Sequence, residues 1–415
     1  MFKNGSKLLV GIKSSNVLRC FIGLVLLIFV ACDGSNENSE KISSTLSTVT
    51  PIPEGEVTHS QPTPASESSL PTTALSTSTA TVVASTVVSS SKPPITRRAH
   101  PDGTEVGFEA KRFKDVPGIV DATNFGWPRD IETSEGLVTL EKPPTKVHSL
   151  SLGHTEILAA LMDFSKVSAV YSFFTDPEQS NIADLSKSHN LIGFDPEEVV
   201  ALEPEIVIAS RFTDADNVAL LKDAGIPVAR ASLENSALGN VPNILLIGYM
   251  VGAEKEALLL ADEIERRMQF VDDILNDNDH PRVLSISKFT SIFVAGSGST
   301  EGGIIEQAGG VNAAADSGIE GHQQITIEGI TAINPDVIVV PQPTEGANAF
   351  ISELKLNAAL FEVPALKNDR IYYVLPKYHT TLSHWNVRGV EQMAALLFPS
   401  DFQDVDMNDF SHYTR

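Results

Sequence analysis

The chain has 415 residues, a formal net charge of −23 and 42% hydrophobic residues. At about 100 to 200 residues per domain, this length allows two or three domains with a substantial core. The acidic balance argues against binding of the nucleic-acid backbone, which needs a concentrated positive surface. Both cysteines, Cys20 and Cys32, lie near the N-terminus, which excludes a small scaffold held together by disulfides.

Residues 1–31 have the pattern of an export signal. Four basic residues and no acid precede an apolar run over 21–30, which is much shorter than the ~20 apolar residues that span a bilayer. The run ends in Val30-Ala31-Cys32 and resembles a bacterial lipobox, with Phe29 where leucine is usual. The resemblance implies lipid attachment at Cys32 and anchoring on the extracytoplasmic face of the cell membrane. The alternative is an ordinary secretory signal.

Residues 32–95 are dominated by Ser, Thr, Pro, Ala and Val and contain no aromatic residue. Such a segment cannot bury enough apolar surface to offset the entropy of ordering, so it is predicted to be a disordered tether. The segment 96–142 follows as an N-terminal extension. Its residues 125–140 are predicted to form a hairpin that turns at Ser134-Glu135-Gly136.

Residues 143–252 alternate between short apolar runs and helical patterns, which predicts an α/β lobe. Strands alternating with helices indicate parallel βαβ units with helices on both faces. The predicted strands are 147–152, 167–171, 206–209 and 228–231, and the predicted helices are 155–162, 196–202 and 215–224.

A long helix is predicted over 254–275, within a connecting segment 253–276 that begins after Gly252. About 22 helical residues span ~33 Å, enough to join two lobes. A second α/β lobe is predicted over 277–415. Its predicted strands are 283–286, 292–295, 337–340 and 371–374, and its predicted helices are 301–308, 327–333 and 386–397.

The two lobes contain a repeated segment. Residues 196–209 (PEEVVALEPEIVIA) align with residues 327–340 (IEGITAINPDVIVV) on a shared proline. Glu197 and Glu328 then stand at the same place, in the first turn of a predicted helix. Each glutamate can simply complement its own helix dipole, worth about 0.3 to 1 kcal/mol. As a matched pair on two lobes, they can also form a two-point docking surface.

From about 143 to 399 the chain resembles the periplasmic or lipid-anchored substrate-binding proteins that serve ABC importers of cobalamin, ferric siderophores and haem. Each matching segment is weak, but their order and spacing over some 250 residues carry the resemblance. They are residues 149–151 (SLS), 155–158 (TEIL), 193–197 (GFDPE), 201–205 (ALEPE), 224–228 (AGIPV), 295–299 (AGSGS), 308–312 (AGGVN), 333–338 (INPDVI) and 366–372 (LKNDRIY).

The resemblance implies two Rossmann-like lobes bridged by a single long α-helix, with a ligand cleft between the lobes. It implies a monomer without a cofactor of its own, whose transported ligand is a ferric chelate, haem or cobalamin. It also implies a partner, the permease dimer with its ATPase subunits. In the family one glutamate on each lobe pairs with permease arginines, a role that falls here to Glu197 and Glu328.

Open α/β sheets bind ligands beyond the carboxyl ends of their strands, so the loops after the strands supply the ligand candidates. Aromatic walls with a few polar groups suit a broad, flat chelate. Phe173 and Phe212 can instead pack in the core or at its rim, and His154 can cap a helix. The loop 296–299 can cradle an anion or form a tight turn. The candidates are His154, Tyr171, Phe173, Arg211, Phe212, Lys288, Gln342, Tyr378, His379 and Trp385.

Two other classes remain open. A receptor for a bare transition-metal ion such as Zn, Mn or Fe needs three or four converging ligands, and no HxH or HExxH spacing is present, so no metal site is predicted. A serine hydrolase using Ser151 or Ser299 lacks the G-x-S-x-G elbow. Because the sequence also has no Walker loop, we expect no catalytic residue and a partner that supplies ATP hydrolysis.

Overall fold

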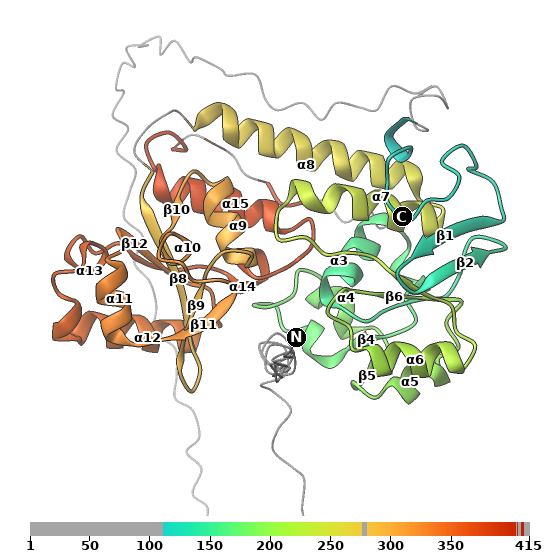
Figure 1. Cartoon of the computed structure of the whole chain (residues 1–415), viewed down its shortest axis with the longest axis horizontal. Helices are drawn as coiled ribbons and strands as arrows, with labels where there is room; N and C mark the ends of the chain where they lie inside the picture. Colours follow the sequence, from blue (N-terminus) through green and yellow to red (C-terminus); the bar gives the residue numbers. More distant parts are fainter. Residues whose placement is uncertain (1–110, 276–279, 404, 406–407, 411–415) are drawn as a thin grey trace, which may run out of the picture. The chain divides into compact units, whose positions relative to one another are not determined.

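The structure is a computed structural model that describes residues 111–275, 280–403, 405 and 408–410 (Figure 1). The predicted export signal, Cys32 and the tether lie outside the described residues. Within the described ranges, no helix combines the length and the apolar character that a membrane span requires.

The predicted hairpin is confirmed. Strand β1 (Arg129–Thr133) pairs antiparallel with β2 (Gly136–Leu140), and Ser134 and Glu135 form the turn. Residues 111–124, to which the sequence assigned no role, pack together with this hairpin against the helices around Gly252. The hydroxyl of Tyr249 donates to the carbonyl of Asn124 over 3.0 Å, and Arg129 is 2% exposed beneath it.

The N-terminal lobe is built on short parallel strands, as predicted. Three of them form a sheet in the order β3-β6-β7, and β4 pairs in parallel with β5. A parallel bridge between Val147 and Val167 places β4 next to β3. The strands are β3 (Val147–Ser149), β4 (Val170–Tyr171), β5 (Leu191–Ile192), β6 (Ile206–Ala209) and β7 (Val228–Arg230).

The helices of this lobe follow the prediction, with one difference at the first. The strand predicted over 147–152 ends at Ser149, because Ser151 caps a helix that already begins at Leu152: its hydroxyl accepts from the backbone N–H of His154 over 3.3 Å. The helices are α3 (Leu152–Leu161), α4 (Ala183–Lys187), α5 (Pro196–Ala201) and α6 (Ala215–Asp223). Only α4 and β5 were not predicted.

Two helices separated by Gly252 follow the lobe. Gly252 has a φ of 73° and ends α7 (Val241–Val251) in the left-handed conformation, which glycine adopts without strain. Helix α8 (Glu254–Ile274) packs against α3 of the N-terminal lobe and against α15 of the C-terminal lobe. Figure 1 shows α8 running alongside both, in agreement with the predicted bridging helix.

The C-terminal lobe contains a mixed sheet in the order β11-β9-β8-β12-β13, with β10 beside β8. Strands β8, β10, β12 and β13 are parallel, whereas β9 and β11 run antiparallel to their neighbours β8 and β9. Three residues connect β8 to β9, which allows only a hairpin. The strands are β8 (Arg282–Lys288), β9 (Ile292–Ala295), β10 (Val311–Asn312), β11 (His322–Ile325), β12 (Val337–Val340) and β13 (Ile371–Tyr373).

Three helices of this lobe were predicted, and the longest was not. Helix α12 begins after Pro343 and buries Ala347, Phe350 and Leu354 on one face, but Gly346 and the preceding prolines obscured its pattern. The helices are α9 (Thr300–Gln307), α10 (Ala313–Asp316), α11 (Ile327–Ile333), α12 (Thr344–Leu356), α13 (Pro364–Lys367), α14 (Pro376–His379) and α15 (Asn386–Leu397).

A buried carboxyl group ties the two lobes together. Glu156 on α3 accepts from the hydroxyl groups of Thr381, over 2.8 Å, and Ser383, which lie between α14 and α15. Asn181 adds a second link, because its side chain donates to the carbonyl of Lys377 over 2.8 Å. Burial raises the pKa of Glu156 in spite of these hydrogen bonds. The interior between the lobes is therefore held by specific polar contacts.

Candidate functional site

The loops after the five parallel strands of the N-terminal lobe meet at one edge of that lobe, because parallel strands end at the same edge. We call this the ligand edge. It carries Phe173 after β4, Phe194 after β5, and Arg211 and Phe212 after β6. Three of these residues were predicted from the sequence. Phe194 was missed, because the two-residue strand that places it was not predicted.

A stack of three aromatic rings lies at the ligand edge. The ring of Phe194 is nearly parallel to that of Tyr171, with 5.1 Å between centroids and 11° between planes. It also stacks on Phe173, at 5.7 Å and 21°. Phe194 is 47% exposed, whereas Tyr171 is 6% exposed. Burial, together with Glu198, raises the pKa of Tyr171, so its hydroxyl stays protonated near neutral pH. The stack therefore offers a flat apolar surface on a buried base.

The loop after β6 presents a cation and an aromatic ring at the same edge of the lobe. The guanidinium carbon of Arg211 lies 4.8 Å from the centroid of Phe212. Arg211 also pairs with Glu234, with 3.3 Å between Nη1 and Oε2. Phe212 is 43% exposed, so its ring lies at the surface of the lobe and not in the core.

The predicted residues of the C-terminal lobe divide between surface and interior. The backbone N–H of Lys288 donates to Gln342 Oε1 over 2.7 Å, which joins the ends of β8 and β12. Gln342 is buried in this role. The side chain of Lys288 is partly exposed and pairs with Glu353. The Gln342 carboxamide therefore supports the strand ends.

Four other candidates lie in the interior: His154, Tyr378, His379 and Trp385. Trp385 stacks on Tyr378 with 6.0 Å between centroids. Burial lowers the pKa of both His154 and His379 to about 4, so both are neutral at pH 7. The helix cap at α3 is Ser151 and not His154. Direct contact between a ligand and these four side chains remains a prediction, and it requires the lobes to rearrange.

The loop 296–299 forms a tight turn in which the first two amides are already bonded. The N–H of Gly296 donates to the Gly321 carbonyl over 2.8 Å, and that of Ser297 to the Ile319 carbonyl over 2.9 Å. A Cβ added at Gly296 would lie 2.1 Å from the Ile319 oxygen, so this approach requires glycine. Ser299 then caps α9 by accepting from Gly302. These bonds favour the turn over an anion cradle.

The two docking candidates occupy equivalent places, as the repeat indicated. Glu197 and Glu328 are exposed, and each is the second residue of its helix, after the caps Asp195 and Thr326. Hydrogen bonds from its own backbone N–H and from Thr326 lower the pKa of Glu328. Both carboxylates are thus available on the surface in matched helix positions.

His322 and Glu301 form a pair that the sequence did not predict. Nε2 of His322, at the start of β11, lies 3.1 Å from both carboxylate oxygens of Glu301 on α9. The negative charge of Glu301 raises the pKa of His322 above its ordinary value of 6.5, although burial opposes this. The pair therefore stabilises the fold fully below about pH 6.5, and this contribution is lost as the pH rises through the raised pKa.

We expect an NMR titration of the full chain to show a pKa above 6.5 for His322. In the Glu301→Gln variant this pKa should fall, because the neutral amide no longer stabilises the imidazolium. Glu306→Gln, on an exposed residue of the same helix, should leave it unchanged. A wild-type pKa of 6.5 or lower would contradict the pairing.

Two hollows on the surface of the described residues lie away from the predicted ligand residues, and none of those residues lines them. One of about 720 Å³ lies at the amino ends of β8, β12 and β13, beside Arg282, Asp336 and Arg370. One of about 320 Å³ lies between the hairpin and β7. Across the described ranges, no three His, Cys, Asp or Glu side chains converge as ligands for a metal ion.

Comparisons with known proteins agree with this architecture. The family model described as "Periplasmic binding protein" matches residues 147–378. An uncharacterised ABC transporter substrate-binding lipoprotein, YvrC of Bacillus subtilis, is 30% identical over 274 residues, 64% of this chain and 84% of the relative. A cobalamin-binding protein of Halobacterium salinarum is 27% identical over 224 residues, 54% of this chain and 61% of that protein.

Solved structures share the fold at low sequence identity. The haem-binding protein RhuT of Roseiflexus sp. RS-1 superposes with a TM-score of 0.53 at 22% identity, covering 62% of this chain and 98% of that one. Molybdate-bound MolA of Haemophilus influenzae gives 0.58 at 21% identity, covering 67% and 94%. Together with the match over 147–378, these similarities confirm the predicted two-lobed α/β fold. The chain belongs to the periplasmic binding protein family, whose members are substrate-binding components of ABC importers.

Proposed function

We propose that this chain is an extracytoplasmic substrate-binding lipoprotein that captures a ferric siderophore, haem or cobalamin and delivers it to an ABC importer permease. The stack of Tyr171, Phe173 and Phe194 carries the proposal. An exposed ring backed by two parallel rings suits the broad apolar face of a metal chelate. Relatives named for cobalamin and neighbours named for haem support this ligand class.

The cation of the loop after β6 suits the polar rim of such a ligand. Arg211 is partly exposed and only loosely paired with Glu234, at 3.3 Å, so it can donate to carboxylate or phosphate groups of a cargo. A bare oxyanion is a weaker candidate, because the amides of Gly296 and Ser297 are already bonded. The arrangement therefore favours a large ligand with an apolar face and a polar rim.

The remaining parts of the proposal concern delivery. Cys32 carries the lipid anchor, the chain works as a monomer, and the partner is the permease dimer with its ATPase subunits. Glu197 and Glu328 dock on that dimer through charged pairs with arginines, because two separated points fix the orientation of the binding protein. The chain itself is not an enzyme and carries no resident cofactor.

A thermal-shift panel on the purified full chain tests the ligand class. The panel contains cyanocobalamin, haemin, ferric siderophores, molybdate, Zn²⁺ and Mn²⁺. A ligand at 100 times its Kd adds about 2.7 kcal/mol to the free energy of unfolding, which raises Tm by roughly 5 to 10 °C. We expect one of the chelates to do so. A shift only with Zn²⁺ or Mn²⁺ would establish the bare-metal alternative instead.

The same panel, repeated on variants, tests the aromatic stack. Phe194→Ala should weaken binding of that chelate by roughly tenfold, since an aromatic contact contributes about 0.5 to 1.5 kcal/mol beyond its buried area. Phe361→Ala is the matched control, because Phe361 is a phenylalanine of the C-terminal lobe with 54% exposure. If the two variants bind the chelate with equal affinity, the aromatic stack is not part of the binding surface.

A further inference from the structure

The hairpin β1–β2 lies outside the residues matched by the family model, yet it is attached to the sheet of the N-terminal lobe. Both of its strands adjoin β7. The backbone N–H of Arg230, the last residue of β7, donates to Thr133 Oγ1 over 3.3 Å. Lys222 donates to the Glu135 carbonyl over 2.8 Å. The turn of the hairpin is therefore fixed beside the last strand of the ligand edge.

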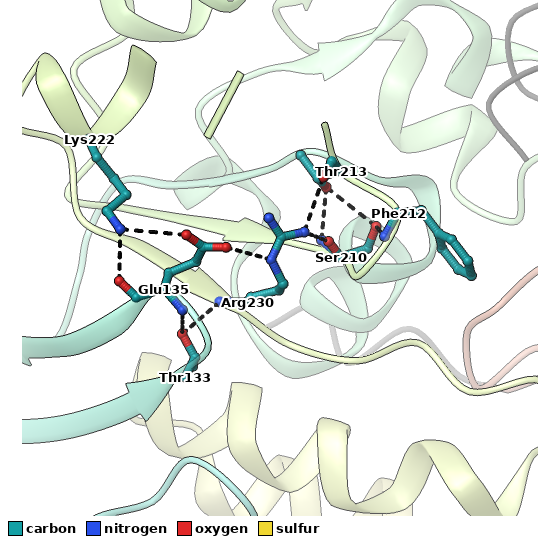
Figure 2. A network of polar contacts seen from close by, with 7 residues as sticks. All are labelled: Thr133, Glu135, Ser210, Phe212, Thr213, Lys222 and Arg230. Carbon is teal, nitrogen blue, oxygen red and sulfur yellow. Dashed lines mark hydrogen bonds and ion pairs between the residues drawn. The ribbon is translucent and has the colours of Figure 1, made fainter. Parts of the chain in front are cut away.

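The side chain of Arg230 connects this hairpin to the loop after β6 (Figure 2). Its Nε donates to Glu135 Oε1 over 2.7 Å. Its Nη1 donates to the carbonyls of Ser210 and, over 3.2 Å, Thr213. The side chains of Arg230 and Glu135 are 15% and 18% exposed. Because a guanidinium is planar with fixed donors, these acceptors set both its position and its orientation.

Charge complementarity reinforces the connection. Although burial acts to raise it, the pKa of Glu135 is held below its ordinary value by Arg230 and Lys222. Glu135 is therefore an anion near neutral pH and balances the largely buried charge of Arg230. Without this carboxylate, the guanidinium of Arg230 would face only neutral carbonyl groups. Water would then compete with those carbonyls for its N–H donors.

The loop 210–213 is a tight turn whose two ends are the residues that Arg230 holds. The N–H of Thr213 donates to the Ser210 carbonyl over 3.1 Å, and the N–H of Ser210 donates to Thr213 Oγ1 over 3.0 Å. Arg211 and Phe212 form its tip, and Figure 2 shows the Phe212 ring pointing away from the network. Fixing both ends of the turn fixes the direction of the two tip side chains.

We propose that Glu135 and Arg230 are positioning residues, which hold the loop 210–213 in the conformation that presents Arg211 and Phe212 to the cargo. This inference rests on the proposed function, because it assumes that the cargo binds at the ligand edge. A loop that is ordered before binding loses less conformational entropy when the cargo binds, so the complex is tighter. The N-terminal extension thereby becomes part of the binding apparatus.

Hydrogen exchange on the full chain without ligand tests the connection itself. In Glu135→Ala and Arg230→Met, the amides of Ser210 and Thr213 should exchange at least tenfold faster than in the wild type. Glu205→Ala is the matched control, since Glu205 forms an ion pair with Lys142 in the same lobe and does not contact the loop. Unchanged exchange in 210–213, or an equal increase across the whole lobe, would overturn the proposal.

Binding of cyanocobalamin and haemin to the same variants tests the role in capture. Glu135→Ala should weaken whichever probe the wild type binds by roughly five- to tenfold, mainly through faster dissociation, and Glu205→Ala should not. Glu135→Gln keeps the shape of the side chain but removes its charge. Its affinity for the probe should therefore lie between those of Glu135→Ala and Glu205→Ala. A loosened loop with unchanged affinity would refute the positioning role. A wild-type chain that binds neither these probes nor the ferric siderophores of the thermal-shift panel would refute the cargo class, while the exchange data still decide whether Arg230 holds the loop.

Discussion

Replacing both docking candidates, in the Glu197→Ala, Glu328→Ala double variant, is expected to abolish cargo uptake while leaving cargo affinity unchanged. Both carboxylates are exposed and occupy the second position of their helices, so neither supports the core or the ligand edge. Losing a desolvated charge pair costs about 2 kcal/mol or more. Two such losses weaken docking by on the order of 1,000-fold. Uptake of labelled cargo by cells that depend on this chain measures the effect.

The control is Asp216→Ala combined with Glu345→Ala. Asp216 on α6 and Glu345 on α12 are also exposed acids at the second helix position, one in each lobe. The control variant matches the double variant in lost charge and in lost helix-dipole interaction, so its uptake should stay near that of the wild type. An equal loss of uptake in both variants would mean that the loss comes from removing negative charge in general and not from a docking pair. A loss of cargo affinity would place Glu197 or Glu328 at the ligand edge instead.

The largest loss of stability is expected from Glu391→Ala on α15. Glu391 accepts from Nε and Nη2 of Arg267 over 2.7 and 2.6 Å, and from Arg388 over 2.7 Å. All three residues are buried. Removing the carboxylate leaves Arg267 and Arg388 without their buried partner, with only the more exposed acids Glu263 and Asp409 beside them. Breaking a buried ion pair in this way costs about 3 to 5 kcal/mol. Calorimetry should show a decrease in Tm of roughly 10 °C.

Glu263→Ala is the matched control for this prediction. Glu263 also faces Arg267, over 3.6 Å, but its side chain is 21% exposed. Water screens such a pair, so its loss should cost less than about 1 kcal/mol. Because Arg267 lies on α8 and Glu391 on α15, the difference between the two variants also measures how firmly α8 is attached to the C-terminal lobe. Comparable losses from both variants would mean that burial does not strengthen the pair.

The elements with long or repeated patterns were predicted well from the sequence. Helix α15 was predicted at its observed bounds, and β6 and β12 follow equivalent prolines in the repeat. The missed elements are short or interrupted. Strand β5 has two residues, and β11 reads His-Gln-Gln-Ile, in which no alternation of apolar and polar residues is visible. Pattern reasoning depends on several periods of a helix or strand, and these segments do not supply them.

The candidate site was predicted less completely, and the buried residues show why. Trp385 and Tyr378 were predicted to line the ligand cleft because they follow a strand of the C-terminal lobe, but α14 and α15 carry them into the interior, where Trp385 packs on Phe410. Phe194 was not considered a ligand residue, although it is 47% exposed on two stacked rings. Position after a strand predicts the edge of the sheet and not the direction of a side chain.

The sequence by itself determined the order of the two α/β lobes and the matched glutamates, because these depend on local periodicity and on a repeat that needs no tertiary contact. The family followed from the resemblance of ordered motifs over some 250 residues. Only the tertiary structure decided which loop side chains face outward and where the hairpin of the N-terminal extension packs. Those properties depend on contacts between residues far apart in the chain, such as Glu135 with Arg230 and Glu156 with Ser383. No local pattern encodes such pairs, since each forms only when the lobes and the hairpin have packed.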